Sequence, residues 1–208
     1  MILSLIILYV LSLIYLSMAD RFRSHTTILA LQGLLLFGIA MARMHAFHPV
    51  EMGFIVVETL VFKAIIIPII LLHVIRKTKI NRITSSSTQF GSLMMSIVAL
   101  VASCTITYYM QNSGSDTISF GVALYALLSG LILIVMRKRV FAHLVGFLVI
   151  ENGVFLFSMA IGVEMPMLIN AAIMLDILMS VLMLGMFMTK VDDQIHTDDS
   201  DSLTHVKD

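Results

Sequence analysis

The chain has 208 residues, of which 59% are hydrophobic and only 12% are charged, and its mean hydropathy is +1.01. A soluble domain cannot hide this much apolar surface, so the composition indicates an integral membrane protein. The net charge of zero gives no basis for nucleic-acid binding, and a single cysteine excludes an intrachain disulfide or a cysteine metal cluster. No phosphate-binding or metal-binding motif is present, so we expect no cofactor in this chain.

Seven apolar runs along the chain are each long enough to cross roughly 30 Å of hydrocarbon. Polar backbone groups in lipid must be hydrogen-bonded within their own segment, so each run is predicted to be a helix. The predicted spans are 2–19, 26–45, 52–75, 90–110, 118–136, 140–162 and 165–189. The predicted fold class is therefore all-α, a polytopic membrane protein with seven transmembrane helices.

These spans divide the chain into four predicted regions. Residues 1–82 hold the first three helices, 83–116 the fourth helix with its flanks, 117–190 the last three helices, and 191–208 an acidic cytoplasmic tail. The first run ends in Ser17-Met18-Ala19, which is similar to a signal-peptide cleavage site. No basic residue precedes this run and it is long enough to span, so we favour a retained helix over a cleaved leader.

Basic residues gather on one side of the predicted membrane topology. Eleven lysines and arginines follow the first, third, fifth and seventh spans, whereas Arg43 alone lies on the opposite side when Lys63, inside a span, is set aside. Cytoplasmic loops are enriched in basic residues. We therefore expect the N-terminus outside and the C-terminus in the cytoplasm of a cell membrane.

Two pairs of spans carry similar segments. Gln32-Gly33 in the second span corresponds to Asn152-Gly153 in the sixth, and a basic turn followed by a histidine, His25 or His143, precedes each. Helices 1–3 and 5–7 would then be parallel repeats, an architecture known in membrane proteins, with the fourth helix as the linker. The alternative is a chance similarity between apolar segments.

Ionisable side chains lie near the middle of three predicted spans: Glu58 with Lys63, Glu151, and Asp176. A charge at the bilayer centre costs at least about 2.5 kcal/mol, so four such groups oppose insertion by about 10 kcal/mol. Such residues mark ion or proton paths, and a carboxylate that can be neutral or ionised near neutral pH suits a proton relay. The alternative is that each carboxylate only hydrogen-bonds a neighbouring helix, but uncharged polar residues usually do this.

The third span combines two of these groups with a proline. In an α-helix Glu58 and Lys63 are about 140° apart around the axis, which disfavours a direct salt bridge. Pro68 removes a backbone donor and is expected to kink or break the helix, which suits water entry, although a purely structural proline is equally compatible. Lys63 lies too deep to extend comfortably to the interface, so we favour a switchable base.

Histidines are less specific. His73 and His143, toward the cytoplasmic ends of the third and sixth spans, are candidates for passing protons between the interior and water, with an interfacial role as the alternative. His45 and His48 could reach one metal ion, but only Glu51 stands out as a third ligand, so no metal site is expected. The seventeen methionines indicate adaptable helix packing.

Residues 55–190 carry several segments of a known family. They resemble hydrogenase-4 component E in Phe62-Lys63-Ala64-Ile65-Ile66-Ile67-Pro68, in the segment from Gly146 to Glu151-Asn152-Gly153, and in an aspartate in the last span. Residues Arg137–Lys190 also resemble the three-helix subunit K of respiratory complex I, in the basic turn Arg137-Lys138-Arg139, the run Phe141–Gly146 and the helix-borne Glu151. Two departures from subunit K are a wider spacing from Gly146 to Glu151 and Asp176 in place of a glutamate.

The resemblance implies a membrane-arm subunit of a complex I-like oxidoreductase, of the membrane-bound nickel–iron hydrogenase or formate hydrogenlyase type, in a prokaryotic inner membrane. It implies that this chain is not catalytic and that nickel–iron and iron–sulfur centres belong to other subunits. The implied partners are antiporter-like membrane subunits, a relative of the membrane-embedded H subunit of complex I and, through them, a hydrogenase-type peripheral arm. A proton or sodium path would use Glu58, Lys63, Glu151, Asp176, His73 and His143.

Two other classes of function stay open from the residues. One is an autonomous small cation/proton antiporter, which would work alone in liposomes. The other is a structural scaffold of a membrane complex, which would tolerate loss of its carboxylates.

Overall fold

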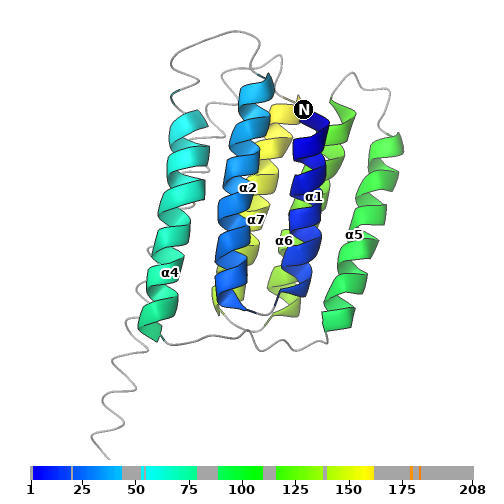
Figure 1. Cartoon of the computed structure of the whole chain (residues 1–208). Helices are drawn as coiled ribbons and strands as arrows, with labels where there is room; N and C mark the ends of the chain where they lie inside the picture. Colours follow the sequence, from blue (N-terminus) through cyan, green and yellow to red (C-terminus); the bar gives the residue numbers. More distant parts are fainter. Residues whose placement is uncertain are drawn as a thin grey trace, which may run out of the picture.

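The computed structural model describes residues 2–19, 21–43, 53, 55–78, 89–109, 116–137, 140–161, 179 and 183. In this part of the chain every regular element is a helix and none is a strand. The elements are α1 (Ile2–Met18), α2 (Phe22–Arg43), η1 (Val56–Ile66), α4 (Ile67–Thr78), α5 (Gln89–Tyr109), α6 (Thr117–Met136) and α7 (Val140–Ile161). They run roughly parallel or antiparallel to one another in an elongated bundle (Figure 1).

Four of these helices are long and apolar enough to cross a membrane, namely Phe22–Arg43, Phe90–Tyr109, Thr117–Met136 and Phe141–Ile161. Shorter apolar helices are present at Ile2–Met18 and Thr59–Leu72. The predicted all-helical fold class is therefore confirmed for the described residues, and the four long apolar helices are compatible with a membrane-embedded protein. The observed helices begin and end within four residues of the first six predicted spans. The seventh span, 165–189, lies outside the described residues except for Met179 and Met183, as does the acidic tail, so the count of seven stays a prediction.

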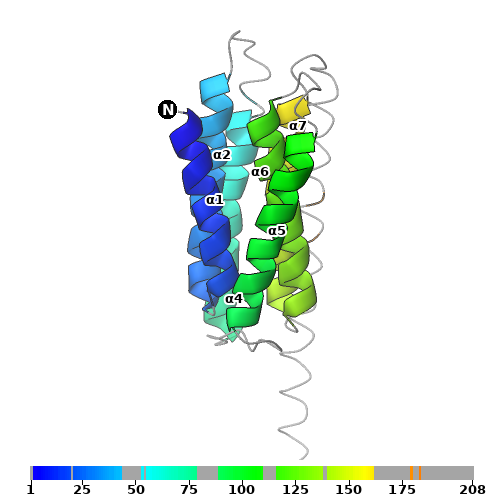
Figure 2. The same ribbon diagram turned by 90° about the vertical axis from the view of Figure 1, so that its right-hand side faces the viewer.

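Two antiparallel hairpins form the centre of the bundle. The α1–α2 hairpin packs against the α6–α7 hairpin, and Figure 2 shows them side by side in two layers. α4 with η1 flanks α2 at one edge, and α5 packs on α1 and α6 at the other (Figure 1). The centre of the bundle is thus where α1, α2, α6 and α7 meet.

The α6–α7 hairpin packs backbone against backbone at two glycines. A Cβ atom at Gly130 would lie 2.6 Å from the carbonyl oxygen of Gly146, and a Cβ atom at Gly146 would lie 2.8 Å from the carbonyl oxygen of Gly130. Small residues at helix crossings let membrane helices approach closely, because van der Waals packing replaces the hydrophobic effect there. This contact fixes the position of α7, which carries Glu151.

Part of the third predicted span is a π-helix, η1. In η1 the wide turns close with the backbone N–H of Ile67 donating to the carbonyl of Phe62, five residues earlier. α4 follows without a gap, so the helix continues through Pro68 and does not break there. Whether Pro68 kinks the helix stays a prediction. The i→i+5 hydrogen bonds of a π-helix widen each turn, so the 140° separation expected for an α-helix does not carry over to positions 58 and 63 in η1.

The two hairpin turns are joined at the end of the bundle predicted to be cytoplasmic. The buried guanidinium of Arg137 donates to the carbonyl oxygens of Ser17 and Ala19, both at 3.3 Å. The rings of Phe22 and Phe141 meet edge to face, with centroids 4.2 Å apart. Arg137, which follows α6, therefore satisfies carbonyl groups left over at the C-terminal end of α1.

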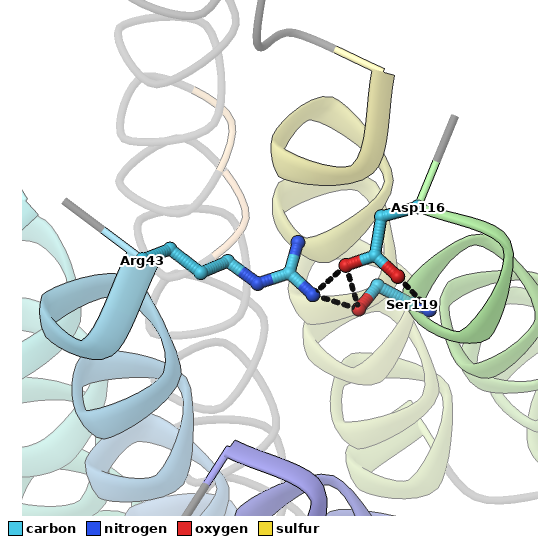
Figure 3. A network of polar contacts seen from close by, with 3 residues as sticks. All are labelled: Arg43, Asp116 and Ser119. Carbon is cyan, nitrogen blue, oxygen red and sulfur yellow. Dashed lines mark hydrogen bonds and ion pairs between the residues drawn. The ribbon is translucent and has the colours of Figure 1, made fainter. Parts of the chain in front are cut away.

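The opposite end of the bundle is joined by an ion pair (Figure 3). Arg43, the last residue of α2, pairs with Asp116 and hydrogen-bonds the Ser119 hydroxyl. Asp116 also caps α6, because its carboxylate accepts from the backbone N–H of Ser119 at 3.4 Å. The one basic residue predicted on the outer side is thus held by an acidic group.

Candidate functional site

A chain of hydrogen bonds crosses the centre of the bundle near mid-helix. The Ser12 hydroxyl donates to the Tyr9 carbonyl at 2.6 Å, and the Gln32 amide donates to the Ser12 oxygen at 3.1 Å. The Asn152 amide then donates to the Gln32 side-chain oxygen at 3.3 Å. All four residues are buried. These bonds connect α1, α2 and α7 and link the two hairpins.

Lys63 reaches this layer from η1. Its side chain is 5% exposed, and its ammonium nitrogen lies 5.0 Å from the centre of the Phe155 ring on α7. A cation over an aromatic face is attracted by the ring quadrupole, most strongly where water is excluded. The lysine side chain of η1 thus reaches α7 in the α6–α7 hairpin.

Glu151 lies in the same layer. It precedes Asn152 on α7, it is 4% exposed, and it stands one helical turn before Phe155. Residues four apart share one face of an α-helix and are neighbours on it. The Lys63 ammonium therefore lies near the face of α7 that carries Glu151.

A glycine on α2 makes this reach possible. A Cβ atom at Gly33 would lie 2.8 Å from the backbone nitrogen of Ala64 and 2.9 Å from the carbonyl carbon of Lys63. No real Cβ atom approaches backbone this closely, so a larger residue would move η1 outward. Since α2 lies between η1 and α1, the close approach lets a lysine side chain extend past α2.

The arrangement has a defined chemical capacity. An ammonium offers three hydrogen-bond donors, and an ionised carboxylate offers only acceptors. Side-chain amides and hydroxyls offer both donors and acceptors. Uncompensated charge in a protein interior is strongly unfavourable, so a proton or cation arriving in such a layer redistributes charge among its members. The layer thus has the groups that a proton or cation relay requires.

The structure brings some of the predicted site residues together and leaves others apart or undescribed. Lys63 and Glu151 lie together in the central layer, whereas His143 lies near the start of α7, its Nε2 2.6 Å from the Arg137 carbonyl oxygen. The side chains of Glu58 and His73, and all of Asp176, lie outside the described part of the chain. The same holds for His45, His48 and Glu51, and no three metal-ligating side chains gather among the described residues.

Several members of the central layer are not among the predicted site residues. The sequence marks Gln32 and Asn152 only by the similarity of their segments, and it does not mark Ser12 or Tyr9 at all. Three of the four are polar residues inside apolar runs, which is a detectable signal. Tyr9 carries no such signal, because an aromatic residue in a span is common.

Comparison of the chain with protein-family models, with curated proteins and with solved structures finds no significant match. The resemblance to hydrogenase-4 component E therefore stays a prediction from its sequence segments.

Proposed function

We propose that this chain is a non-catalytic membrane-arm subunit of a complex I-like oxidoreductase, of the nickel–iron hydrogenase or formate hydrogenlyase type, and that it belongs to the hydrogenase-4 component E family. In this role it contributes buried ionisable residues to proton or sodium translocation, while redox centres reside on other subunits. It binds antiporter-like membrane subunits and a relative of the H subunit of complex I in a prokaryotic inner membrane, with its N-terminus outside.

One observation carries the proposal. Lys63 and Glu151, from helices far apart in the sequence, lie in one buried layer together with the Gln32–Asn152 hydrogen bond. Ionisable residues inside a membrane face protein or water and mark ion pathways by default. The residues of this layer come from four helices, α1, α2, η1 and α7. This favours a path across the chain and disfavours an isolated polar contact.

The hydrogen bonds between the hairpins also support the proposed parallel repeat. Gln32 pairs with Asn152, and the Ser17 carbonyl pairs with Arg137, so both contacts join residues 120 positions apart. Residues that are equivalent in two repeats meet each other only near the axis that relates the repeats. A pseudo-two-fold axis along the membrane normal would pass between α2 and α7, and the polar layer would lie on it.

Two alternative functions remain testable beside this one. An autonomous antiporter would translocate ions when the chain alone is reconstituted into liposomes. A scaffold would keep full ion coupling after its carboxylates are neutralised. The membrane-arm proposal predicts neither outcome.

The decisive experiment has two stages. The chain is purified from native membranes under mild detergent and its companions are identified, with hydrogenase-type and antiporter-like subunits expected. Ion uptake and redox turnover are then measured in vesicles that contain the intact complex. The test variant combines Glu151→Gln with Asp176→Asn. The control variant is Glu164→Gln, in a predicted outer loop. Loss of uptake with preserved assembly is expected for the double variant, and unchanged coupling would favour the scaffold.

A further inference from the structure

The ion pair of Arg43 and Asp116 crosses one end of the four central helices (Figure 3). α1 packs on α2 and α6, and α7 packs on the same two helices, so α2 and α6 stand at opposite corners of this group. Arg43 is the last residue of α2, and Asp116 directly precedes α6. Their contact therefore runs diagonally over the axis that the four helices share, at the end predicted to face outside. We call this end the outer mouth.

The central layer lies on the inner side of this ion pair. Gln32, which hydrogen-bonds Asn152 in that layer, precedes Arg43 by eleven residues on α2. At a rise of 1.5 Å per residue, the two positions are about 16 Å apart along the helix. The ion pair is thus placed between the central layer and the outer surface of the bundle.

The inner end of the same four helices is closed by buried side chains. The guanidinium of Arg137, which follows α6 and is 2% exposed, binds the carbonyl oxygens of Ser17 and Ala19 on α1. The rings of Phe22 and Phe141 join α2 to α7. Both helix pairs that connect the two hairpins are therefore held together at the inner end.

The contact at the outer mouth is more accessible to water. The side chain of Arg43 is 17% exposed and that of Asp116 is 36% exposed. Ion pairs that water reaches contribute little to stability and are screened by salt. The outer mouth is therefore the end of the bundle that opens more readily.

The two partners differ in how firmly they are held. The Asp116 carboxylate also accepts hydrogen bonds from the backbone N–H and the hydroxyl of Ser119, at 3.4 Å and 3.1 Å. It lies at the N-terminus of α6, where the helix dipole favours negative charge. Asp116 thus keeps its position without Arg43, whereas the long side chain of Arg43, at the end of its helix, can swing away.

We propose that the Arg43–Asp116 ion pair is a gate at the outer mouth, and that the proton or cation of the ion path enters the central layer from this side when Arg43 swings away. The inference rests on the proposed ion path and assigns its entrance. The carboxylate of Asp116 and the hydroxyl of Ser119, once Arg43 has left them, offer oxygen acceptors that attract a small cation to the entrance.

The competing role for the ion pair is that of a tether, which only holds α2 to α6. Loss of a tether loosens the bundle and changes access to the central layer from both ends or from neither. Loss of a gate opens the central layer from the outer mouth alone. The rate at which a reagent reaches the central layer from each side of the membrane therefore distinguishes the two roles.

The test measures this access in membrane vesicles that contain the intact complex. Cys104, exposed on α5, is replaced by serine, and Ser12→Cys places a thiol in the central layer. A membrane-impermeant methanethiosulfonate reagent is applied to right-side-out and to inverted vesicles, and labelling of this chain is followed by mass spectrometry. The side from which a separate Ser113→Cys variant reacts identifies the outer mouth.

Two arginine variants are compared in the Ser12→Cys background. Arg43→Gln removes the ion pair, and Arg23→Gln is the matched control, because Arg23 is an exposed arginine at the other end of the same helix. We expect Arg43→Gln to raise the labelling rate from the outer mouth by about fivefold, as the loss of an exposed ion pair would. Labelling from the inner side should stay unchanged, and Arg23→Gln should match the parent on both sides.

Salt provides a second measurement that needs no disruptive variant. Because salt screens an exposed ion pair, higher ionic strength should raise labelling from the outer mouth in the parent and not in Arg43→Gln. Asp116→Asn replaces Arg43→Gln if the latter does not accumulate. Equal labelling of the parent and the gate variant, an equal rise from both sides, or no labelling from either side would overturn the gate.

The outcomes also separate this inference from the proposed function. Labelling does not depend on ion transport, whereas the proposed function is tested by ion uptake per redox turnover in the variant that combines Glu151→Gln with Asp176→Asn. A one-sided rise in labelling, together with unchanged uptake in that variant, would support the gate and refute the ion path.

Discussion

Gly33 on α2 and Lys63 on η1 touch through their backbones. A Cβ atom at Gly33 would come within 2.9 Å of the Lys63 carbonyl carbon and 2.8 Å of the Ala64 nitrogen. Because Gly33 has no side chain, η1 can pack close to α2 at this point. From that position the Lys63 side chain is long enough to reach the central layer.

The first prediction concerns this contact. We expect Gly33→Ala to move η1 outward and to destabilise the chain by about 1–3 kcal/mol, as overpacking does. Ion uptake per turnover should fall, because the Lys63 ammonium withdraws from Phe155. Uptake in vesicles and thermal unfolding of the purified complex measure the two effects.

Gly38 on the same helix provides the control. A Cβ atom there would meet only the end of the Leu5 side chain, at 3.3 Å, which can move aside. Gly38→Ala should therefore leave both measurements nearly unchanged. Equal behaviour of the two alanine variants would show that the close approach at Gly33 is not required.

The second prediction concerns the amide pair between the hairpins. Gln32→Met and Asn152→Leu should each destabilise the chain, because each leaves the partner amide unsatisfied in the interior. The double variant should lose less than the sum of the two, with a coupling energy of about 0.6 kcal/mol, which is typical of polar contacts between membrane helices. A double-mutant cycle on reversible unfolding measures it, and strict additivity would argue against a paired contact.

The third prediction concerns the inner ends of the hairpins. Arg137→Met should destabilise the chain by about 2–3 kcal/mol, because the carbonyl oxygens of Ser17 and Ala19 lose a charged donor. The control is Arg23→Met, since Arg23 is exposed, and its effect should stay within about 0.5 kcal/mol. Denaturant unfolding of the two purified variants distinguishes them, and similar losses would contradict the role of Arg137.

Hydrophobicity alone predicts the helical architecture, for a physical reason. A bilayer requires about 20 apolar residues per helix and leaves no other way to satisfy the backbone. Runs such as 118–136 and 140–162 therefore end within a residue or so of the observed α6 and α7. The π-helical turns of η1 escape such a prediction, because they change the hydrogen-bond register of an apolar segment without changing its composition.

The long-range contacts of the site are less predictable. Lys63 and Glu151 stand out as costly charges in apolar runs, but their common layer depends on Gly33, whose contact with η1 leaves no local signal. The sequence presents Arg137 as one basic residue of a cytoplasmic turn, whereas its guanidinium is buried against α1. Orientation rules count positive charges and contain no information about which of them fold back into the protein.

The last prediction concerns membrane orientation. Eleven basic residues follow the odd-numbered predicted spans, and Arg43, the single exception, is paired with Asp116 (Figure 3). Orientation follows the count of lysines and arginines, and eleven against one is a large bias, so we expect the N-terminus outside. The measurement is labelling by a membrane-impermeant thiol reagent in intact cells. Cys104 is exposed on α5 and is first replaced by serine. In that background Ser113→Cys should react from outside, and Ser86→Cys should react only after the membrane is permeabilised. Labelling of Ser86→Cys in intact cells would show that the orientation is reversed or that the number of spans is not seven. The predicted side of the membrane at which Arg137 joins the two hairpins would then also be wrong.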